Sequence, residues 1–157
     1  AVSSGMTSRV IVPFALADSG SRWHVRAYDR RTNEFRDFVL ARIADARFDD
    51  APIDDKELPE HDIQWNRIVE LELVPHPANM RNPDTIEAEY GMTDGMRVIR
   101  VRAALVGYML RRWNVDCTPD HSLRGGENYL WLKNRQALYG VTNLVLAPGY
   151  TESNMDR

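Results

Sequence analysis

Short apolar-rich runs separated by turn-forming residues, one of them with regular alternation at residues 23–28, predict β-strands in the first fifty residues. Strands are predicted at residues 9–16, 23–28, 35–40 and 43–48, with turn-forming residues at 17–21 and 29–33. On the second strand, one face is apolar and is formed by Trp23, Val25 and Ala27. The other face is largely polar and is formed by His24, Arg26 and Tyr28. Short strands at this density predict a small, strongly bent β-barrel.

The pattern changes between residues 49 and 65, where acidic residues and two prolines replace most of the apolar positions. We interpret residues 51–65 as an acidic linker between a first domain at 1–50 and a second at 66–150, with a tail at 151–157. A solvated tether is the simplest role for such a segment. The alternative is a pseudo-substrate segment that occupies a basic site.

Strands and helices alternate in the second domain, which predicts an α+β fold. Strands are predicted at 67–74, 96–101, 129–132 and 143–147, and helices at 82–90, 103–113 and 134–139. Asn82 precedes a proline at the start of the first helix, and Gly91 is predicted to end it. The second helix carries apolar residues that would form either core or a dimer contact: Leu105, Tyr108, Met109 and Trp113.

The composition is that of an ordinary globular chain, with 43% hydrophobic and 27% charged residues among 157. No apolar run reaches about 18 residues, so a membrane span is not expected. Residues 1–7 lack the basic and apolar regions of a signal peptide, and Cys117 is the only cysteine. We therefore expect a protein of the reducing cytoplasm.

The net charge of −3 is distributed unevenly along the chain. Residues 1–48 contain eight arginines against five acidic residues, whereas residues 49–72 contain nine acidic and two basic residues. Lysine occurs only at Lys56 and Lys133, and arginine differs from lysine in gripping phosphate or carboxylate with two bonds. A GC-rich coding bias would explain the preference for arginine, but not the concentration of arginine on predicted strands.

Motifs for catalysis and for phosphate loops are missing from the sequence. Cys117 and His121 are four residues apart, but the other histidines show no pairing at the spacing of zinc ligands. The acidic pairs lie in the linker, where flexible chain cannot hold two carboxylates for acid–base chemistry. We therefore expect no enzyme, no cofactor and no metal.

Basic and aromatic side chains lie on one side of each of two neighbouring strands: His24, Arg26 and Tyr28 on the first, and Arg36, Phe38 and Arg42 on the return segment. Opposite side chains of paired strands are about 5 Å apart, so these groups are predicted to converge. Asp29, Asp37 or the acidic linker could neutralise them. Otherwise the cluster suits a phosphate, with aromatic faces available to stack on bases.

These residues resemble a WYL domain. The likeness rests on Arg22-Trp23-His24-Val25, Arg26-Ala27-Tyr28-Asp29, Arg36-Asp37-Phe38 and Ala41-Arg42-Ile43, preceded by the strand at 9–16. The Trp-Tyr-Leu triplet that names the family is Trp23-His24-Val25 here, which departs at two positions but resembles the form in WYL regulators of phage-defence islands. The stretches 69–77, 89–92 and 101–105 are similar to the C-terminal extension that follows many WYL domains.

The resemblance implies a five-stranded, Sm-like barrel of the SH3 type, followed by an α+β extension domain. It implies a dimeric transcription regulator that senses a nucleic acid or nucleotide on the barrel and binds operator DNA through an N-terminal winged helix, which we expect to be absent from this chain. The implied ligand-binding residues are Trp23, His24, Arg26, Tyr28, Arg36, Phe38 and Arg42. A serine of the family's first strand would fall at Ser3 or just before Ala1.

We interpret the chain as the ligand-sensing and dimerisation region of a bacterial repressor of a phage-defence locus. Two alternatives stay open. One is a constitutive single-stranded nucleic-acid-binding module, whose affinity would fall steeply with salt. The other is a purely structural dimerisation unit, whose arginines pair with the acidic linker.

Overall fold

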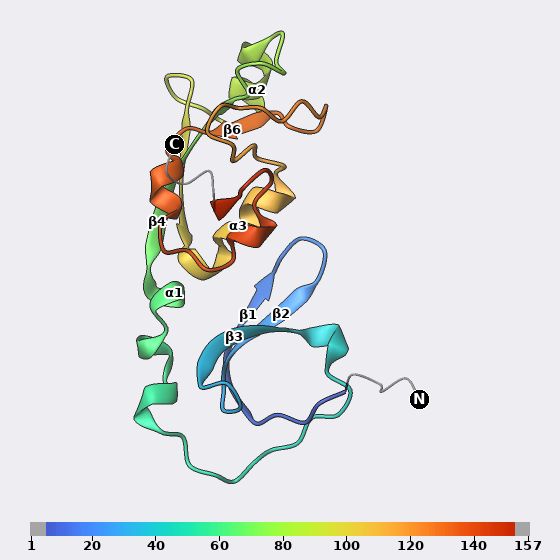
Figure 1. The fold of residues 1–157 in the computed structure, drawn as a ribbon, viewed down its shortest axis with the longest axis vertical. Coiled ribbons are helices and arrows are strands. Elements are labelled where there is room, and N and C mark those ends of the chain that lie inside the picture. The colour runs from blue at the N-terminus through green and yellow to red at the C-terminus, as the bar shows by residue number, and fades with distance from the viewer. Residues whose placement is uncertain (1–5, 153–157) are drawn as a thin grey trace. The chain divides into compact units, whose positions relative to one another are not determined.

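The computed structural model describes residues 6–152, which form parts of two compact units, residues 1–62 and 63–157 (Figure 1). Each unit has its own antiparallel sheet of three strands. The predicted position of the family's pocket serine, at Ser3 or before Ala1, lies outside the described residues. Within residues 6–152 no helix is long and apolar enough to cross a membrane.

The sheet of the first unit has the strand order β1-β2-β3 and is built by two successive hairpins. Its strands are β1 (Ile11–Asp18), β2 (Trp23–Asp29) and β3 (Glu34–Val39), close to three of the predicted ranges. Pro13 lies on the edge strand β1, where its missing N–H interrupts no central ladder, and a register shift follows it. Asn33 has a positive φ of 56° in the second hairpin, a conformation that asparagine tolerates.

The strand predicted at 43–48 is wrong. Residues Leu40–Arg42 form a 3₁₀ turn, η1, and no strand follows it before residue 50. Phe48, the largest apolar residue of that stretch, is fully exposed, so a strand there would have no apolar face to bury. The five-stranded barrel is not confirmed, because the strands described in the first unit form an open sheet of three.

The acidic segment that follows contains local structure. Two 3₁₀ turns, η2 (Asp55–Glu57) and η3 (Pro59–His61), are drawn in teal to green in Figure 1. A capping box at Asp54 and Glu57 starts the first turn, since the Glu57 carboxylate accepts the Asp54 backbone N–H at 3.1 Å. The segment is therefore ordered by its own sequence as well as by the contacts described below.

The sheet of the second unit has the order β5-β4-β6, with β4 (Ile68–Pro75) between β5 (Arg97–Arg102) and β6 (Leu130–Leu132). Alternate residues of β4 are buried, as predicted: Val69, Leu71 and Leu73. The helices are α1 (Ile63–Asn66), α2 (Pro83–Glu89) and α3 (Ala103–Arg112), with 3₁₀ turns η4 (Arg135–Leu138) and η5 (Leu144–Leu146). The α+β prediction is confirmed at this level.

Two details of the second unit differ from the sequence prediction. The strand predicted at 143–147 is the turn η5, in which Leu144 and Ala147 are buried three residues apart while Val145 is 91% exposed. The core face of α3 also differs, because Val106 and Leu110 are fully buried. The predicted apolar residues of this segment are half-buried: Leu105, Tyr108, Met109 and Trp113. Met109 and Trp113 pack against the buried core, which confirms the core alternative for these two.

Candidate functional site

The register of β2 and β3 divides the predicted binding residues between two faces of the sheet. Arg26 pairs with Asp37, whereas Arg36 pairs with Ala27 and Phe38 with Val25. Directly opposite residues project to the same side, so Arg26 shares its side with His24 and Tyr28 but not with Arg36 and Phe38. The predicted convergence is therefore wrong. It required a register that differs by one residue from the observed register, and a difference of one residue exchanges the two faces of a strand.

Arg26 of the first unit is buried and binds two carboxylates. It is 7% exposed, and its Nε and Nη2 donate to the two oxygens of Asp62 at 2.8 and 3.0 Å, a bidentate pair. Its Nη1 donates to Asp37 at 3.3 Å. Burial alone would lower the pKa of Arg26, but the hydrogen bonds and charges of the two carboxylates outweigh it and raise the pKa above its usual value.

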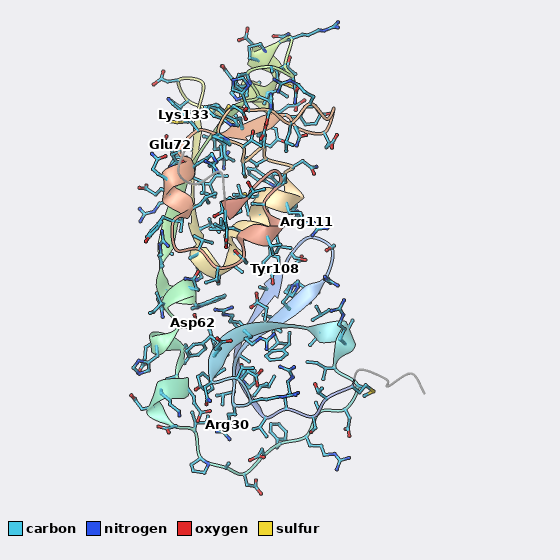
Figure 2. All side chains as sticks on the ribbon, viewed as in Figure 1. Arg30, Asp62, Glu72, Tyr108, Arg111 and Lys133 are labelled. Carbon is cyan, nitrogen blue, oxygen red and sulfur yellow. The ribbon has the colours of Figure 1, made fainter. Side chains whose placement is uncertain are left out.

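A second arginine on the same strand–turn unit binds the acidic segment. Arg30 donates from Nε to Glu57 at 2.6 Å and from Nη2 to the Pro52 carbonyl at 3.1 Å. The hydrogen bond from Arg30 is the main cause that lowers the pKa of Glu57. The segment predicted to be a solvated tether instead binds the first unit through two ion pairs, Glu57 with Arg30 and Asp62 with Arg26. Figure 2 labels Asp62 and Arg30.

The opposite face has its own buried carboxylate. Asp29 is fully buried and accepts Arg9 Nη1 at 2.7 Å and the backbone N–H of Arg31 at 3.0 Å. Burial raises the pKa of Asp29, but these donors outweigh burial and leave the pKa below its usual value. Arg36 Nη1 lies 3.7 Å from the same carboxylate and its side chain is 44% exposed, so Arg36 is only partly engaged.

The remaining predicted residues have different surroundings. His24 and Tyr28 are buried, and the Tyr28 hydroxyl donates to Asn33 at 3.4 Å. Trp23 is 52% exposed at the start of β2. Phe38 is half-buried, with the Arg9 guanidinium 5.8 Å from the centre of its ring. Arg42 is exposed in η1, and among residues 6–152 no ion pair to it is found.

Sequence reasoning raised the acidic linker as one source of neutralising carboxylates but did not identify the contacts. Arg9 and Arg30 were missed as partners, as were the particular acids Glu57 and Asp62. The hairpin pattern predicts neighbours across strands, whereas Asp62 reaches Arg26 from 36 residues away. A net excess of acid next to a basic sheet was the one available indication.

The second unit contains a buried polar network of a different kind. His76 Nδ1 accepts the backbone N–H groups of Ala78 and Asn79, so its Nε2 carries the proton and donates to Asp116 at 2.7 Å. Asp116 also accepts the hydroxyl of Thr118 at 2.7 Å. These bonds join two loops of the unit, and every member has a partner, which indicates a structural role.

Within residues 6–152, no buried group of possible metal ligands is found. Cys117 is buried, and burial is the main cause that raises the pKa of its thiol, which disfavours the thiolate that zinc requires. On the surface of the first unit, ligand atoms of Asp55, Glu60 and His61 lie within 4.8 Å of one another, but all three residues are exposed. Exposed carboxylates in such a group commonly occur without an ion.

Comparison with known proteins identifies both halves of the chain. Residues 2–48 match the family model of the WYL domain, and residues 68–138 match that of the BrxR transcriptional regulator, C-terminal dimerization domain. This chain belongs to the WYL-domain transcriptional regulators. The two matched ranges of this WYL regulator leave residues 49–67 between them, so Glu57 and Asp62 lie outside both.

Curated relatives of the WYL regulator are named DNA-binding transcriptional repressor CapW. The relative from Escherichia coli (strain KTE188) is 33% identical over 136 residues, which cover 86% of this chain and 44% of the relative. The relative from Pseudomonas aeruginosa is 35% identical over 109 residues, 69% of this chain and 36% of its own length. The relative from Stenotrophomonas maltophilia is 36% identical over 110 residues, with 68% and 36% covered. The chain spans less than half the length of these relatives.

Proposed function

We propose that this chain is the effector-sensing and dimerisation region of a bacterial transcriptional repressor. The order of a WYL domain and a C-terminal dimerization domain supports this proposal, as do the relatives named CapW repressors. The repressor acts in the cytoplasm as a homodimer, at the operator of a phage-defence locus. Operator DNA is contacted by a part of the repressor outside these 157 residues.

The effector in this proposal is a phosphate-bearing anion, either a short nucleic acid or a nucleotide. The observation that carries it is the buried fork of Arg26, which is aligned for a bidentate acceptor and shares its side of β2 with His24 and Tyr28. A phosphate offers the same pair of acceptor oxygens as the carboxylate of Asp62. These three residues bind the phosphate group and the sugar or base next to it.

The other predicted residues form a second set of contacts in this proposal. Arg36 and Phe38 lie on the opposite side of the sheet from Arg26, and Arg42 lies in η1. Trp23, Arg36 and Arg42 are exposed and can receive the following nucleotides of a strand by stacking and by contacts to phosphate. Phe38 lies on the side of Arg36 and supports that second set. An effector that binds one dimer arrangement better than another shifts the population between them and alters the spacing of the DNA-reading parts. Closure of the first unit into a full Sm-like barrel stays a prediction.

The ion pairs favour a second candidate, a purely structural dimerisation unit. Arg26 and Arg30 already have carboxylate partners at 2.6 to 3.0 Å, so their charges are compensated without any effector. In that case the arginines contribute stability to the first unit and bind no ligand. The two candidates predict different results for one experiment.

The experiment is fluorescence anisotropy with labelled single-stranded DNA and RNA octamers, at about 50 and about 200 mM salt. The wild-type chain is compared with the double variant Arg26→Ala/Arg42→Ala and with Arg111→Ala/Arg112→Ala, which removes the same charge from the second unit. Micromolar binding that is lost only in the first variant is the result expected for an effector site. Absence of binding at low salt, together with earlier melting of the first variant, would establish the structural candidate instead.

A further inference from the structure

The carboxylate of Asp62 occupies Arg26 in the way a phosphate would. Both of its oxygens accept from the guanidinium, at 2.8 and 3.0 Å, and the side chain is 2% exposed. Five residues earlier, Glu57 occupies Arg30 at 2.6 Å and is 4% exposed. Two anionic groups of one short segment therefore cover two cations of one strand–turn unit.

Residues 54–62 are bound to the rest of the first unit mainly by ion pairs. Residues 51–56 are exposed, and Ile53, their largest apolar residue, is 59% exposed. Leu58 and Pro59 are half-buried, and neither belongs to the buried core. Ion pairs can be exchanged for other ion pairs without opening a hydrophobic core, whereas a segment held by buried apolar side chains cannot be displaced in this way.

We propose that residues 54–62 are an internal anion that occupies the effector site and that a phosphate-bearing effector must displace. The inference rests on the effector site proposed above and adds how that site is regulated. The effector competes with Asp62 for Arg26, and with Glu57 for Arg30 when it carries a second phosphate. Bound effector and docked segment exclude each other.

Displacement of Asp62 changes the chain at the boundary of the two units. Asp62 is the last residue of the first unit. Gln64 belongs to the second unit, where its Nε2 donates to the Gly140 carbonyl at 2.9 Å and its Oε1 accepts the Thr142 N–H at 3.2 Å. Only Ile63 separates these two anchored residues. If Asp62 is released while Glu57 stays docked, residues 58–62 become part of the unanchored linker between the two units. The maximum length of that linker then increases by about 17 Å, at about 3.4 Å per residue.

The test uses the full 157-residue chain and a fluorescein-labelled oligothymidylate of eight nucleotides. Asp62→Asn removes the competing charge at Arg26, and Glu57→Gln does so at Arg30. Glu60→Gln is the matched control, since Glu60 is exposed on the same segment and the charge change is identical. Loss of one charge-assisted ion pair changes an equilibrium constant by about a factor of ten or more. Asp62→Asn is therefore expected to bind the oligothymidylate about tenfold more tightly than wild type, and Glu60→Gln within about twofold of wild type.

Hydrogen–deuterium exchange supplies the second readout. Saturating oligothymidylate is expected to speed exchange in residues 54–62 of the wild type, and Asp62→Asn is expected to show fast exchange there without ligand. Glu57→Gln keeps the buried Asp62 in place and carries the same test if Asp62→Asn fails to fold.

The alternatives give separate results. Equal affinities of wild type, Asp62→Asn and Glu57→Gln, with unchanged exchange in residues 54–62, would overturn the competition and leave the effector site intact. Weaker binding by Asp62→Asn, with unchanged melting, would show that Asp62 orients Arg26 for the effector and would overturn displacement. No binding by any variant would overturn the effector site together with its regulation. Inorganic phosphate and pyrophosphate, added as competitors, distinguish a site for the phosphate group alone from one that needs the nucleotide.

Discussion

Replacement of Arg26 by alanine removes the cation on which two carboxylates of the first unit converge. Asp62 is 2% exposed and takes two hydrogen bonds from this guanidinium, while Asp37 takes a longer one at 3.3 Å. The variant leaves both acids near an apolar gap in place of the guanidinium. Removal of one member of a buried ion pair destabilises proteins by about 3–5 kcal/mol.

The expected loss for Arg26→Ala lies at the lower end of that range, about 3 kcal/mol, because residues 54–62 can leave the sheet and let Asp62 be hydrated. The double variant Arg26→Ala/Asp62→Asn is expected to recover about 1–2 kcal/mol of this loss, since the buried charge is removed together with its cation. Arg42→Ala is the control, as Arg42 is exposed and is expected to change stability by less than about 0.5 kcal/mol.

The assay must separate the two units, because a single unfolding curve would mix them. Native-state hydrogen exchange gives a free energy of opening for the amides of β2 in the first unit and of β4 in the second. Arg26→Ala is expected to lower the opening free energy of β2 and to leave that of β4 unchanged. A loss in β2 below about 1 kcal/mol, or an equal loss in β4, would refute the assignment of Arg26 to a buried ion pair of the first unit.

Other perturbations give distinct results. Gly107→Ala in α3 would place a Cβ in a clash with the Asn143 carbonyl oxygen, so we expect the free energy of unfolding of the second unit in urea to fall by about 2–3 kcal/mol. An unchanged midpoint would contradict this close approach. His76→Ala removes the donor to the buried Asp116 and the acceptor of the backbone N–H groups of Ala78 and Asn79, with an expected loss of about 3 kcal/mol in the opening free energy of the β4 amides. Asp29 has a lowered pKa, so its contribution to stability is complete above its unfolded pKa of about 3.9 and disappears as pH falls through the folded value. The opening free energy of β2, obtained after correction for the pH dependence of intrinsic exchange, should therefore stay constant from pH 7 to about 5 and fall below about pH 4.

Regular alternation predicted two of the paired strands. The ranges 23–28 and 67–74 have a side-chain period of two, and each is a strand within about one residue of its predicted bounds. The range 35–40 does not alternate, yet it is also a strand within about one residue of its predicted bounds. The two wrong strands, at 43–48 and 143–147, have no paired neighbour among the described residues, although 43–48 is as long as 23–28 and alternates over residues 44–48. A run of this length fits a strand or a turn equally well, and tertiary pairing decides between them.

The candidate site was harder to predict than the strands. The hairpin residues were identified, but the side on which Arg36 projects depends on the register, which the pattern of β3 does not specify. The contact of Asp62 with Arg26 depends on how the chain returns after 36 residues, and no local pattern encodes it. Both errors concern pairings between segments, which only the folded arrangement determines.

In the proposed site the Arg26 guanidinium binds a phosphate with two hydrogen bonds, and Arg26→Lys removes this geometry. Lysine keeps the positive charge but cannot form the bidentate pair. In anisotropy titrations with the labelled oligothymidylate, we expect Arg26→Lys to bind about tenfold more weakly than wild type, while Arg111→Lys, the same exchange at an exposed position of the second unit, binds within about twofold of it. Equal affinities of Arg26→Lys and wild type, or no measurable binding by either, would contradict this binding geometry.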